Sequence, residues 1–458
     1  MRPIRIGNGA GFWGDSPAAP REILQAGELD YLTLEYLAEL TLSILSHQKQ
    51  KNPHAGFVPD VAKVSTHLAE CIQQGATTKL VTNGGGMNPA GCAADVALAI
   101  CEKGLSELKI GVVTGDDFAD RIDELRGAGV SMDNMDTGES FGKIQDRIAS
   151  ANVYLGAAGI VEALEQDAAI VVTGRIADAS LVTGPCIHGF GWDFSEIDKI
   201  AKATVAGHLI ECGAQVTGGF YSDWSEDIPL GNVGYPIAIV DENGDSRITK
   251  PPGSGGVVNE KTCAEQLIYE IGDPARYGTP DVIADFSQVQ FQLSAQDEVT
   301  VRGGKANGVP DKLKASIAYY DGFMASSMIV VVGPDSVAKA RAAGQAVFEK
   351  LERDGVVFDE TRIEVLGSGD TIPGLALSQG NPWEVVLRLT ARSSRREFTD
   401  RLGRELAPLV TSGPPGITGY TGAKSRSTPV LSFWPTLIDR EHFTTKVEVK
   451  AASEWLIT

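Results

Sequence analysis

The stretch VVTGRIADASLVTGP, residues 171–185, contains the transition that decides the fold. It opens as a short apolar run, breaks at a Thr-Gly pair and continues with helical spacing, which predicts a buried strand followed by a helix over residues 175–187. Arg175 and Asp178 stand at this transition. Such an arginine presents a fixed cationic fork to a carboxylate or phosphate, and the aspartate could orient it or move a proton. The alternative is a salt bridge that caps the helix.

The same pattern of strand, glycine turn and helix recurs along the first half of the chain. Short apolar runs bounded by glycine occur near residues 6, 80, 111 and 171, and each precedes a helical pattern. Strands of this kind that alternate with helices indicate an α/β fold with a mostly parallel sheet and helices on both faces. Hairpins appear in the second half. We therefore expect an α/β domain with Gly-rich strand-end loops over residues 1–284 and a mixed α+β domain over residues 285–458.

Two segments give sharper local predictions. The segment DYLTLEYLAELTLSILSHQK predicts a strand at about residues 30–35 and a helix from Leu37 onward. The segment YPIAIVDENGDSRITK, residues 235–250, predicts a strand, an Asn-Gly turn and a second strand, which is a hairpin.

Composition restricts the partners. Among 458 residues, 60 acidic residues oppose 40 basic ones, and the net charge of −20 disfavours a nucleic-acid surface or an anionic membrane. The N-terminal segment lacks a signal-peptide pattern, and no window approaches the roughly 18 apolar residues of a membrane helix, so we expect a cytoplasmic protein without a membrane partner. Six cysteines without a CxxC pair fit a reducing compartment. A symmetric homo-oligomer is the simplest expectation for assembly.

The glycine-rich strand ends form a candidate anion site. In a parallel sheet these ends and the following helix N-termini share one side, where unpaired N–H groups attract a small anionic substrate. The candidate residues are Asn8, Gly9, Gly11, Asn83, Gly84, Gly85, Gly86, Asn88, Thr114, Gly115, Thr173 and Gly174. No turn matches a nucleotide-binding fingerprint, so an NAD-dependent dehydrogenase ranks last among the functions considered. The alternative is that these glycines merely make tight turns.

A second cluster lies in AGHLIECGAQVTGG, residues 206–219. On a helix His208, Glu211 and Cys212 share one face, so His208 could act as general base with Glu211 fixing its tautomer. The alternative is a helix end with a hydrogen-bonded histidine and a buried cysteine. The candidate catalytic residues are thus Arg175, Asp178, His208, Glu211 and Cys212. Metal dependence stays open, because Asp116, Asp117, Asp178 and Glu211 could bind Mg²⁺ but acidic residues are abundant throughout the chain.

Several stretches together resemble the acyclic terpene utilisation AtuA family. They are DYLTLEYLAELT, VTNGGGMNPAGC, VTGRIADASLVTGP, GHLIECGAQVTGG, CAEQLIYEIGDPARYGTPDVIADF and LKASIAYYDGF. The resemblance extends over roughly residues 3–450. It implies a role in bacterial catabolism of citronellol and geraniol, a pathway that runs through branched acyl-CoA thioesters, carboxylation and hydration. Many members carry an additional C-terminal ferredoxin-like domain, whereas this chain ends at KVEVKAASEWLIT. We therefore expect a separate small ferredoxin-like subunit or a variant function.

Two functions of different classes follow. The first is a lyase, a hydratase or dehydratase that acts on a CoA thioester or carboxylate, with CoA as part of the substrate. His208 or Asp178 then abstracts a proton next to the carbonyl, and Arg175 or a backbone amide stabilises the enolate. The second is a noncatalytic acyl-CoA-binding or scaffold subunit that needs the small ferredoxin-like partner.

Overall fold

The chain forms two compact units. The computed structural model describes residues 1–456 apart from residues 27, 373–381 and 421–425. The first unit comprises residues 1–318 with 433–458, and the second comprises residues 319–432.

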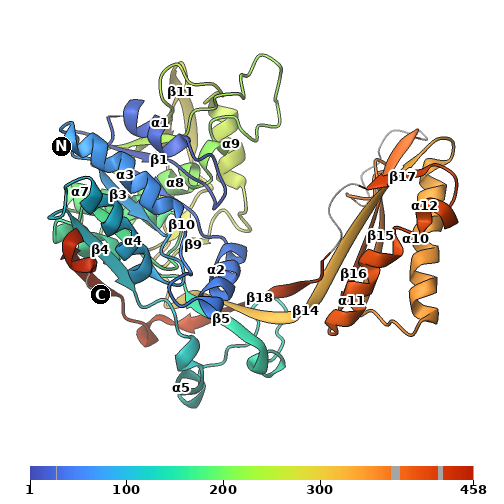
Figure 1. Ribbon diagram of the computed structural model, residues 1–458. Helices are drawn as coiled ribbons and strands as arrows, with labels where there is room; N and C mark the ends of the chain where they lie inside the picture. Colours follow the sequence, from blue (N-terminus) through green and yellow to red (C-terminus); the bar gives the residue numbers. More distant parts are fainter. Residues whose placement is uncertain (27, 373–381, 421–425, 457–458) are drawn as a thin grey trace. The chain divides into compact units, whose positions relative to one another are not determined.

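A ten-stranded sheet forms the centre of the first unit (Figure 1). Its strand order is β11-β12-β8-β7-β1-β2-β3-β6-β4-β19. The strands are β1 (Ile4–Asn8), β2 (Tyr31–Leu34), β3 (Lys79–Thr82), β4 (Lys109–Thr114), β6 (Ile170–Thr173), β7 (Ile237–Val240), β8 (Ser246–Thr249), β11 (Gln290–Ala295), β12 (Glu298–Arg302) and β19 (Lys446–Ala451).

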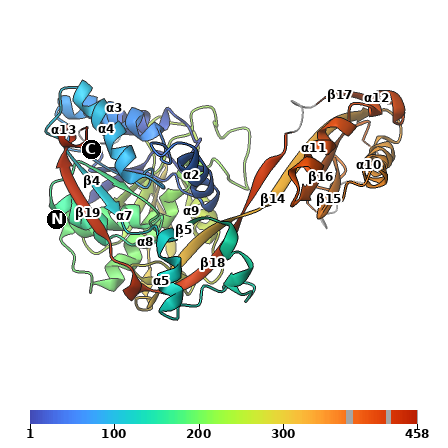
Figure 2. The same cartoon turned by 60° about the horizontal axis from the view of Figure 1, so that its bottom comes forward.

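Parallel pairing is confined to the middle of this sheet, so the expectation of a mostly parallel sheet holds only in part. The five strands β1, β2, β3, β6 and β4 are parallel neighbours. The outer strands all pair antiparallel. The reason is the connections: β7 and β8 are joined by the expected Asn243-Gly244 turn, with Gly244 at φ +86°, and so tight a turn permits only antiparallel pairing. Figure 2 shows β19 beside β4 at the other edge.

Helices cover both faces of the parallel strands, as expected. One face packs against α1 (Ala19–Ala26), α3 (Asp60–Gln73) and α4 (Pro89–Glu102), with α13 (Ala452–Trp455) against α4. The other face packs against α6 (Ala158–Glu165), α7 (Ser180–Phe190) and α8 (Ile197–Glu211). Because both faces are covered, β2 and β6 are buried along their whole length.

Shorter elements complete the first unit. They are α2 (Glu39–Lys51), α5 (Ile122–Gly127), β5 (Ile148–Val153), α9 (Glu260–Ile268), and a small antiparallel sheet of β9 (Tyr277–Gly278), β10 (Ile283–Asp285) and β13 (Lys305–Ala306). Two helix starts differ from the sequence prediction. The helix expected from Leu37 begins at Glu39, and the helix expected from Arg175 begins at Ser180. Arg175 and Asp178 therefore lie on a loop between β6 and α7 instead of on a helix.

The second unit is a sheet with helices. Its strand order is β15 (Glu360–Leu366), β16 (Glu384–Ser393), β14 (Lys312–Val332), β17 (Ile417–Tyr420), and β18 (Thr428–Asp439) also pairs with β14. Residues 312–318 of β14 and 433–439 of β18 belong to the first unit. The helices are α10 (Ser336–Arg353), α11 (Arg396–Glu405) and α12 (Leu409–Ser412). Its core includes Ile329, Val347, Leu351, Leu387 and Leu389.

These units divide the chain differently from the expected boundary at residues 284/285. Strand β12 pairs with β8, and β19 returns to pair with β4, so both strands extend the main sheet of the first unit. Mixed α+β character does begin in the second half, but the separate unit is an insertion at residues 319–432. No helix within the described part of the chain is both long and apolar enough to cross a membrane.

Gly115 provides a test of the packing at the end of β4. Its φ is +112°, and an added Cβ would lie 2.4 Å from the Thr444 carbonyl oxygen, whereas exposed Gly75 at φ +97° has open space around it. We expect Gly75→Ala to cost about 1 kcal/mol of stability for the positive φ alone, and Gly115→Ala to cost a further 1–3 kcal/mol, on the order of an overpacked site. Thermal unfolding of the two variants measures the difference; equal midpoints would contradict a packing role for Gly115.

Candidate active site

A cavity of about 1150 Å³ opens within the first unit. Its walls include Gly11 and Phe12 after β1, residues 35–39 after β2, and Arg175 to Asp178 after β6. The C-terminal end of α8 and residues 276–280 and 309–314 close the other side. The carboxyl ends of three parallel strands therefore meet at one cavity, which is where open α/β sheets bind ligands.

Arg175 is a buried charged group in the lining of the cavity. It is 2% exposed, its guanidinium lies 4.1 Å above the Tyr154 ring, and its Nη1 lies 3.1 Å from Asp178 Oδ1 and donates to the Leu37 carbonyl oxygen. The Nε–H of Arg175 has no hydrogen-bond partner among the described residues. A buried donor without a partner is costly, so this atom marks where a ligand acceptor would be stabilised.

The loop that carries Arg175 is fixed by the Asp116 carboxylate. Asp116 Oδ2 accepts from the Arg175 backbone N–H at 2.8 Å and from the Asn152 amide at 2.8 Å. An added Cβ at Gly174 would lie 2.5 Å from Asp116 Oδ1, so only glycine permits this approach. Burial raises the pKa of Asp116 to about 6, although the hydrogen bonds oppose the shift. Asp116, considered above as a metal ligand, therefore holds the loop.

Two carboxyl groups lie beside Arg175: Glu35, which is buried, and Asp178, whose side chain is partly exposed. Glu35 follows β2, is 5% exposed, and accepts from the backbone N–H of Leu37 at 2.8 Å and from the Asn83 amide. Burial and the charge of Asp178 raise the pKa of Glu35. Burial also raises the pKa of Asp178, although Arg175 and a hydrogen bond with Glu35 oppose it. Burial and the proximity of the two carboxyls thus disfavour the fully ionised pair.

His208 and Glu211 form a second pair that holds a proton. His208 is 2% exposed; its Nδ1 lies 2.8 Å from Glu211 Oε1 and its Nε2 lies 3.2 Å from the Leu267 carbonyl oxygen. Because a carbonyl oxygen only accepts, Nε2 carries a hydrogen, and the proton between Nδ1 and Oε1 is shared. Both ring nitrogens of His208 therefore have hydrogen-bond partners.

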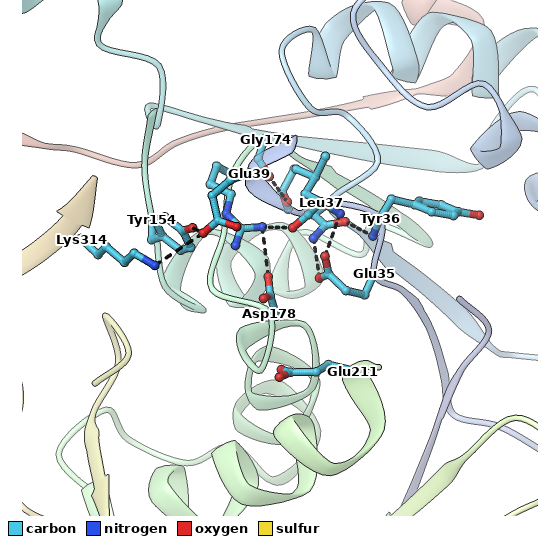
Figure 3. Close-up of polar contacts among 12 residues, drawn as sticks. Glu35, Tyr36, Leu37, Glu39, Tyr154, Gly174, Asp178, Glu211 and Lys314 are labelled. Atoms are coloured by element: carbon cyan, nitrogen blue, oxygen red, sulfur yellow. Dashed lines mark hydrogen bonds and ion pairs between the residues drawn. The ribbon is translucent and has the colours of Figure 1, made fainter. Parts of the chain in front are cut away.

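The free oxygen of Glu211 is another atom of this site without a hydrogen-bond partner. Glu211 lines the cavity, and its Oε2 has no hydrogen-bond partner in the described part of the chain. Burial raises the pKa of Glu211 to about 7, the His208 contact opposes this, and the charge of Asp178 adds to it. Figure 3 shows the Glu211 carboxyl group on the Asp178 side of the site. Glu211 can therefore donate or accept a proton near neutral pH.

A polar cluster of Glu39, Tyr154 and Lys314 borders Arg175. The Tyr154 hydroxyl donates to Glu39 Oε1 at 2.5 Å, and Lys314 Nζ lies 3.5 Å from the same oxygen. Burial opposes ionisation of Glu39, but Arg175, Tyr154 and Lys314 lower its pKa to about 2. Glu39 is thus a fixed anion that holds the Tyr154 ring under the Arg175 guanidinium.

Cys212 lines the cavity but lacks an activating cation. Burial and the neighbouring Glu211 raise the pKa of its thiol. The sequence-based interpretation made nucleophilic catalysis conditional on a cation that lowers this pKa, and here the surroundings act in the opposite direction.

Most of the residues expected to bind an anion lie outside the cavity. Among the described residues, Gly11 is the only member of that set that lines the cavity. Asn8 donates its side-chain amide to the Ile210 carbonyl oxygen at 2.7 Å, Asn88 accepts from the Gly91 N–H at 3.1 Å and caps α4, and an added Cβ at Gly85 would lie 2.5 Å from the Thr173 carbonyl oxygen. The others outside the lining are Gly9, Asn83, Gly84, Gly86, Thr114, Gly115, Thr173 and Gly174. The strand ends do gather, but side chains instead of backbone turns face the cavity.

Two of the four acidic residues considered as Mg²⁺ ligands line the cavity. Asp116 and Asp117 lie outside the cavity lining, whereas Asp178 and Glu211 lie within it. No group of three or more His, Cys, Asp or Glu side chains suited to a metal ion occurs in the ranges that the structure describes.

Comparison with known proteins shows the family of this chain. The model of the acyclic terpene utilisation family protein AtuA matches residues 4–449. The chain belongs to this family. Membership implies a role in acyclic terpene utilisation. No curated protein matches the sequence.

In this AtuA-family chain, sequence reasoning missed Glu35, Glu39, Tyr154 and Lys314. The two glutamates had a signal, because they directly follow a buried strand just as Arg175 does. Tyr154 and Lys314 had none, since each reaches the site only through the tertiary fold.

The His208–Glu211 pair predicts a dependence of stability on pH. Burial lowers the pKa of His208, but Glu211 outweighs it and the pKa is raised, so the folded pair retains a proton that an unfolded histidine releases at about pH 6.5. This stabilisation is fully present below about pH 6.5 and is lost as the pH rises through the folded pKa. Glu211→Gln removes the charge that raises the pKa of His208, and burial, which lowers that pKa, is then opposed only by hydrogen bonds with the backbone. We therefore expect the wild type to lose stability relative to Glu211→Gln as the pH rises above about 6.5.

Calorimetric unfolding across this pH range measures the effect. Glu124→Gln, at an exposed carboxylate of α5, is the matched control and should follow the wild type. Parallel curves for the wild type and Glu211→Gln would show that the pair holds no shared proton.

Proposed function

We propose that this chain is a hydratase or dehydratase of a branched, unsaturated acyl thioester or carboxylate in acyclic terpene breakdown. The observation that carries the proposal is a buried arginine with a free donor, which shares one cavity with the hydrogen-bonded His208–Glu211 pair and with the carboxyls of Glu35 and Asp178. Hydration of a conjugated double bond needs those parts: a cation at the carbonyl oxygen, a base for water and an acid for the α carbon.

Each residue has a specific role in this reaction. The Nε–H of Arg175 donates to the substrate carbonyl oxygen and stabilises the negative charge that develops there. The Asp178 carboxylate removes a proton from water while the water oxygen bonds to the β carbon. Glu211 then delivers its proton to the α carbon, and exchange with solvent restores both groups. His208 and Glu35 are positioning residues, because each acts through the carboxyl beside it.

Apolar side chains in the lining support a hydrocarbon substrate. Phe12 is 54% exposed, Phe220 70%, Val309 43% and Leu437 43%, and all four line the cavity. Exposed apolar groups gathered around a polar centre are typical of ligand sites. The hydrocarbon part would pack there while the carbonyl group meets Arg175.

The alternative is a noncatalytic subunit that binds an acyl thioester and needs a small ferredoxin-like partner. The same cavity would then serve binding alone. The two functions differ in one observable, which is the product.

Mass spectrometry of purified protein incubated with branched 2-enoyl-CoA thioesters tests the proposal. We expect a mass gain of one water, and we expect Arg175→Lys and Glu211→Gln to lower kcat by about 10²–10⁴ because each removes a contact made by the reacting atoms. Glu124→Gln is again the matched control. Ligand-induced thermal stabilisation without product, with or without the small partner, would favour the binding subunit.

Cys212 offers a separate test of the mechanism. Because its thiol stays protonated near neutral pH, we expect Cys212→Ala to retain turnover within about threefold and the enzyme to resist thiol alkylation there. Loss of activity in Cys212→Ala, together with a covalent acyl adduct on the wild-type peptide, would replace acid–base hydration by nucleophilic catalysis.

A further inference from the structure

The cavity carries basic side chains that the proposed reaction does not use. Arg276 precedes β9, and Lys312 and Lys314 open β14; all three are exposed and line the cavity. The net charge of the whole chain is −20. A local group of cations on such a chain indicates a site for an anion.

These cations come from two segments that lie side by side. Arg440 Nη2 donates to the Pro280 carbonyl oxygen at 3.0 Å, and its Nη1 donates to the Pro310 carbonyl oxygen at 3.1 Å. The backbone adds a second link, because Ile283 pairs with Gly278 on one side and its N–H donates to the Gly308 carbonyl oxygen at 2.8 Å on the other. Residues 276–280 and 309–314 therefore form one wall.

Lys312 and Lys314 lie on the same face of β14, about 7 Å apart along the strand. Lys314 Nζ lies 3.5 Å from Glu39 and 5.0 Å from the Tyr154 ring, so it borders the Arg175 cluster. Lys312 Nζ lies 3.7 Å from Asp439, and that pair is half exposed at 54% and 50%. The two lysines thus form a line from the rim towards the reacting centre.

Little in the protein neutralises this wall. Arg276 has no ion pair or side-chain hydrogen bond within the described residues. The two lysine contacts are long and solvated, and such pairs contribute little, so a phosphate can displace them. The other acids along this part of the lining are Glu270 and Asp311.

We propose that Arg276, Lys312 and Lys314 form a phosphate subsite that holds the nucleotide end of an acyl thioester. This inference rests on the proposed function, because it assigns the substrate of the same cavity to the phosphate-bearing class of thioesters over free carboxylates. The phosphates bind at the rim, and the thioester carbonyl reaches Arg175.

Kinetics with paired substrates tests the subsite. The same enoyl group is supplied as a CoA thioester and as a pantetheine thioester, which lacks the nucleotide phosphates. The variant is Arg276→Glu/Lys312→Glu; Lys314 is left intact because it contacts Glu39. The control is Arg21→Glu/Lys63→Glu, the same charge change on α1 and α3, outside the cavity.

We expect the cavity variant to raise KM for the CoA thioester about tenfold or more, to leave KM for the pantetheine thioester within about twofold, and to leave kcat unchanged for both. Added NaCl should raise KM for the CoA thioester in the wild type only. Equal KM values in variant and wild type, or equal increases for both thioesters, would overturn the subsite while the proposed function stands.

A failure of the proposed function has a different result. If the wild type converts neither thioester, calorimetric binding of CoA and of 3′,5′-adenosine bisphosphate tests the subsite directly. Weaker binding to the cavity variant than to the control would retain a phosphate site on a binding protein. Identical binding, or none, would remove the subsite as well.

Discussion

Burial of the Arg175 guanidinium is the constraint on which the site depends. A cation that is 2% exposed loses its hydration and is tolerated only where anions and carbonyl groups surround it. Three strand ends meet this need. Residues after β2 supply the Leu37 carbonyl and Glu39, the loop after β4 supplies Asp116 to the Arg175 backbone, and the loop after β6 supplies Asp178. The contacts of one arginine residue therefore join segments that follow three different strands.

The same burial explains why the neighbouring carboxyls separate into two kinds. Glu39 contacts Tyr154 and Lys314 and lies close to the positive charge of Arg175. These interactions lower the pKa of Glu39, so it stays an anion. For Glu35 and Glu211, nearby positive charges stabilise the ionised carboxylate by less than burial destabilises it. The pKa values of both residues are therefore raised. One low-dielectric environment therefore produces both a structural anion and carboxyls that can exchange protons near neutral pH.

The sequence predicted those features that are local in the chain. The repeated strand, glycine turn and helix predicted the parallel centre, and the Asn-Gly dipeptide predicted the hairpin of β7 and β8. Arg175, Asp178, His208, Glu211 and Cys212 were brought to one cavity as anticipated. The antiparallel edges could not be foreseen, because the pairing of β12 with β8 and of β19 with β4 joins segments that are distant in sequence. The hydrogen bond at His208 Nε2 could not be foreseen for a similar reason: the Leu267 carbonyl that accepts it comes from α9, and no spacing on α8 indicates it.

The raised pKa values also bear on how a strongly acidic chain would admit the proposed anionic ligand. Burial disfavours the charged forms of Glu35 and Asp178 and so raises their pKa values beside Arg175. His208 and Glu211 are neutral as a pair, and Lys314 balances Glu39. The negative charge around Arg175 is thus reduced, and Arg276 adds positive charge at the rim, where Glu270 and Asp311 also line the cavity. Loss of protons from the carboxyls near Arg175 would add negative charge and oppose binding of an anion. In the proposed reaction the raised pKa values therefore have two effects: they supply protons, and they limit the negative charge of the site in a protein whose net charge is −20.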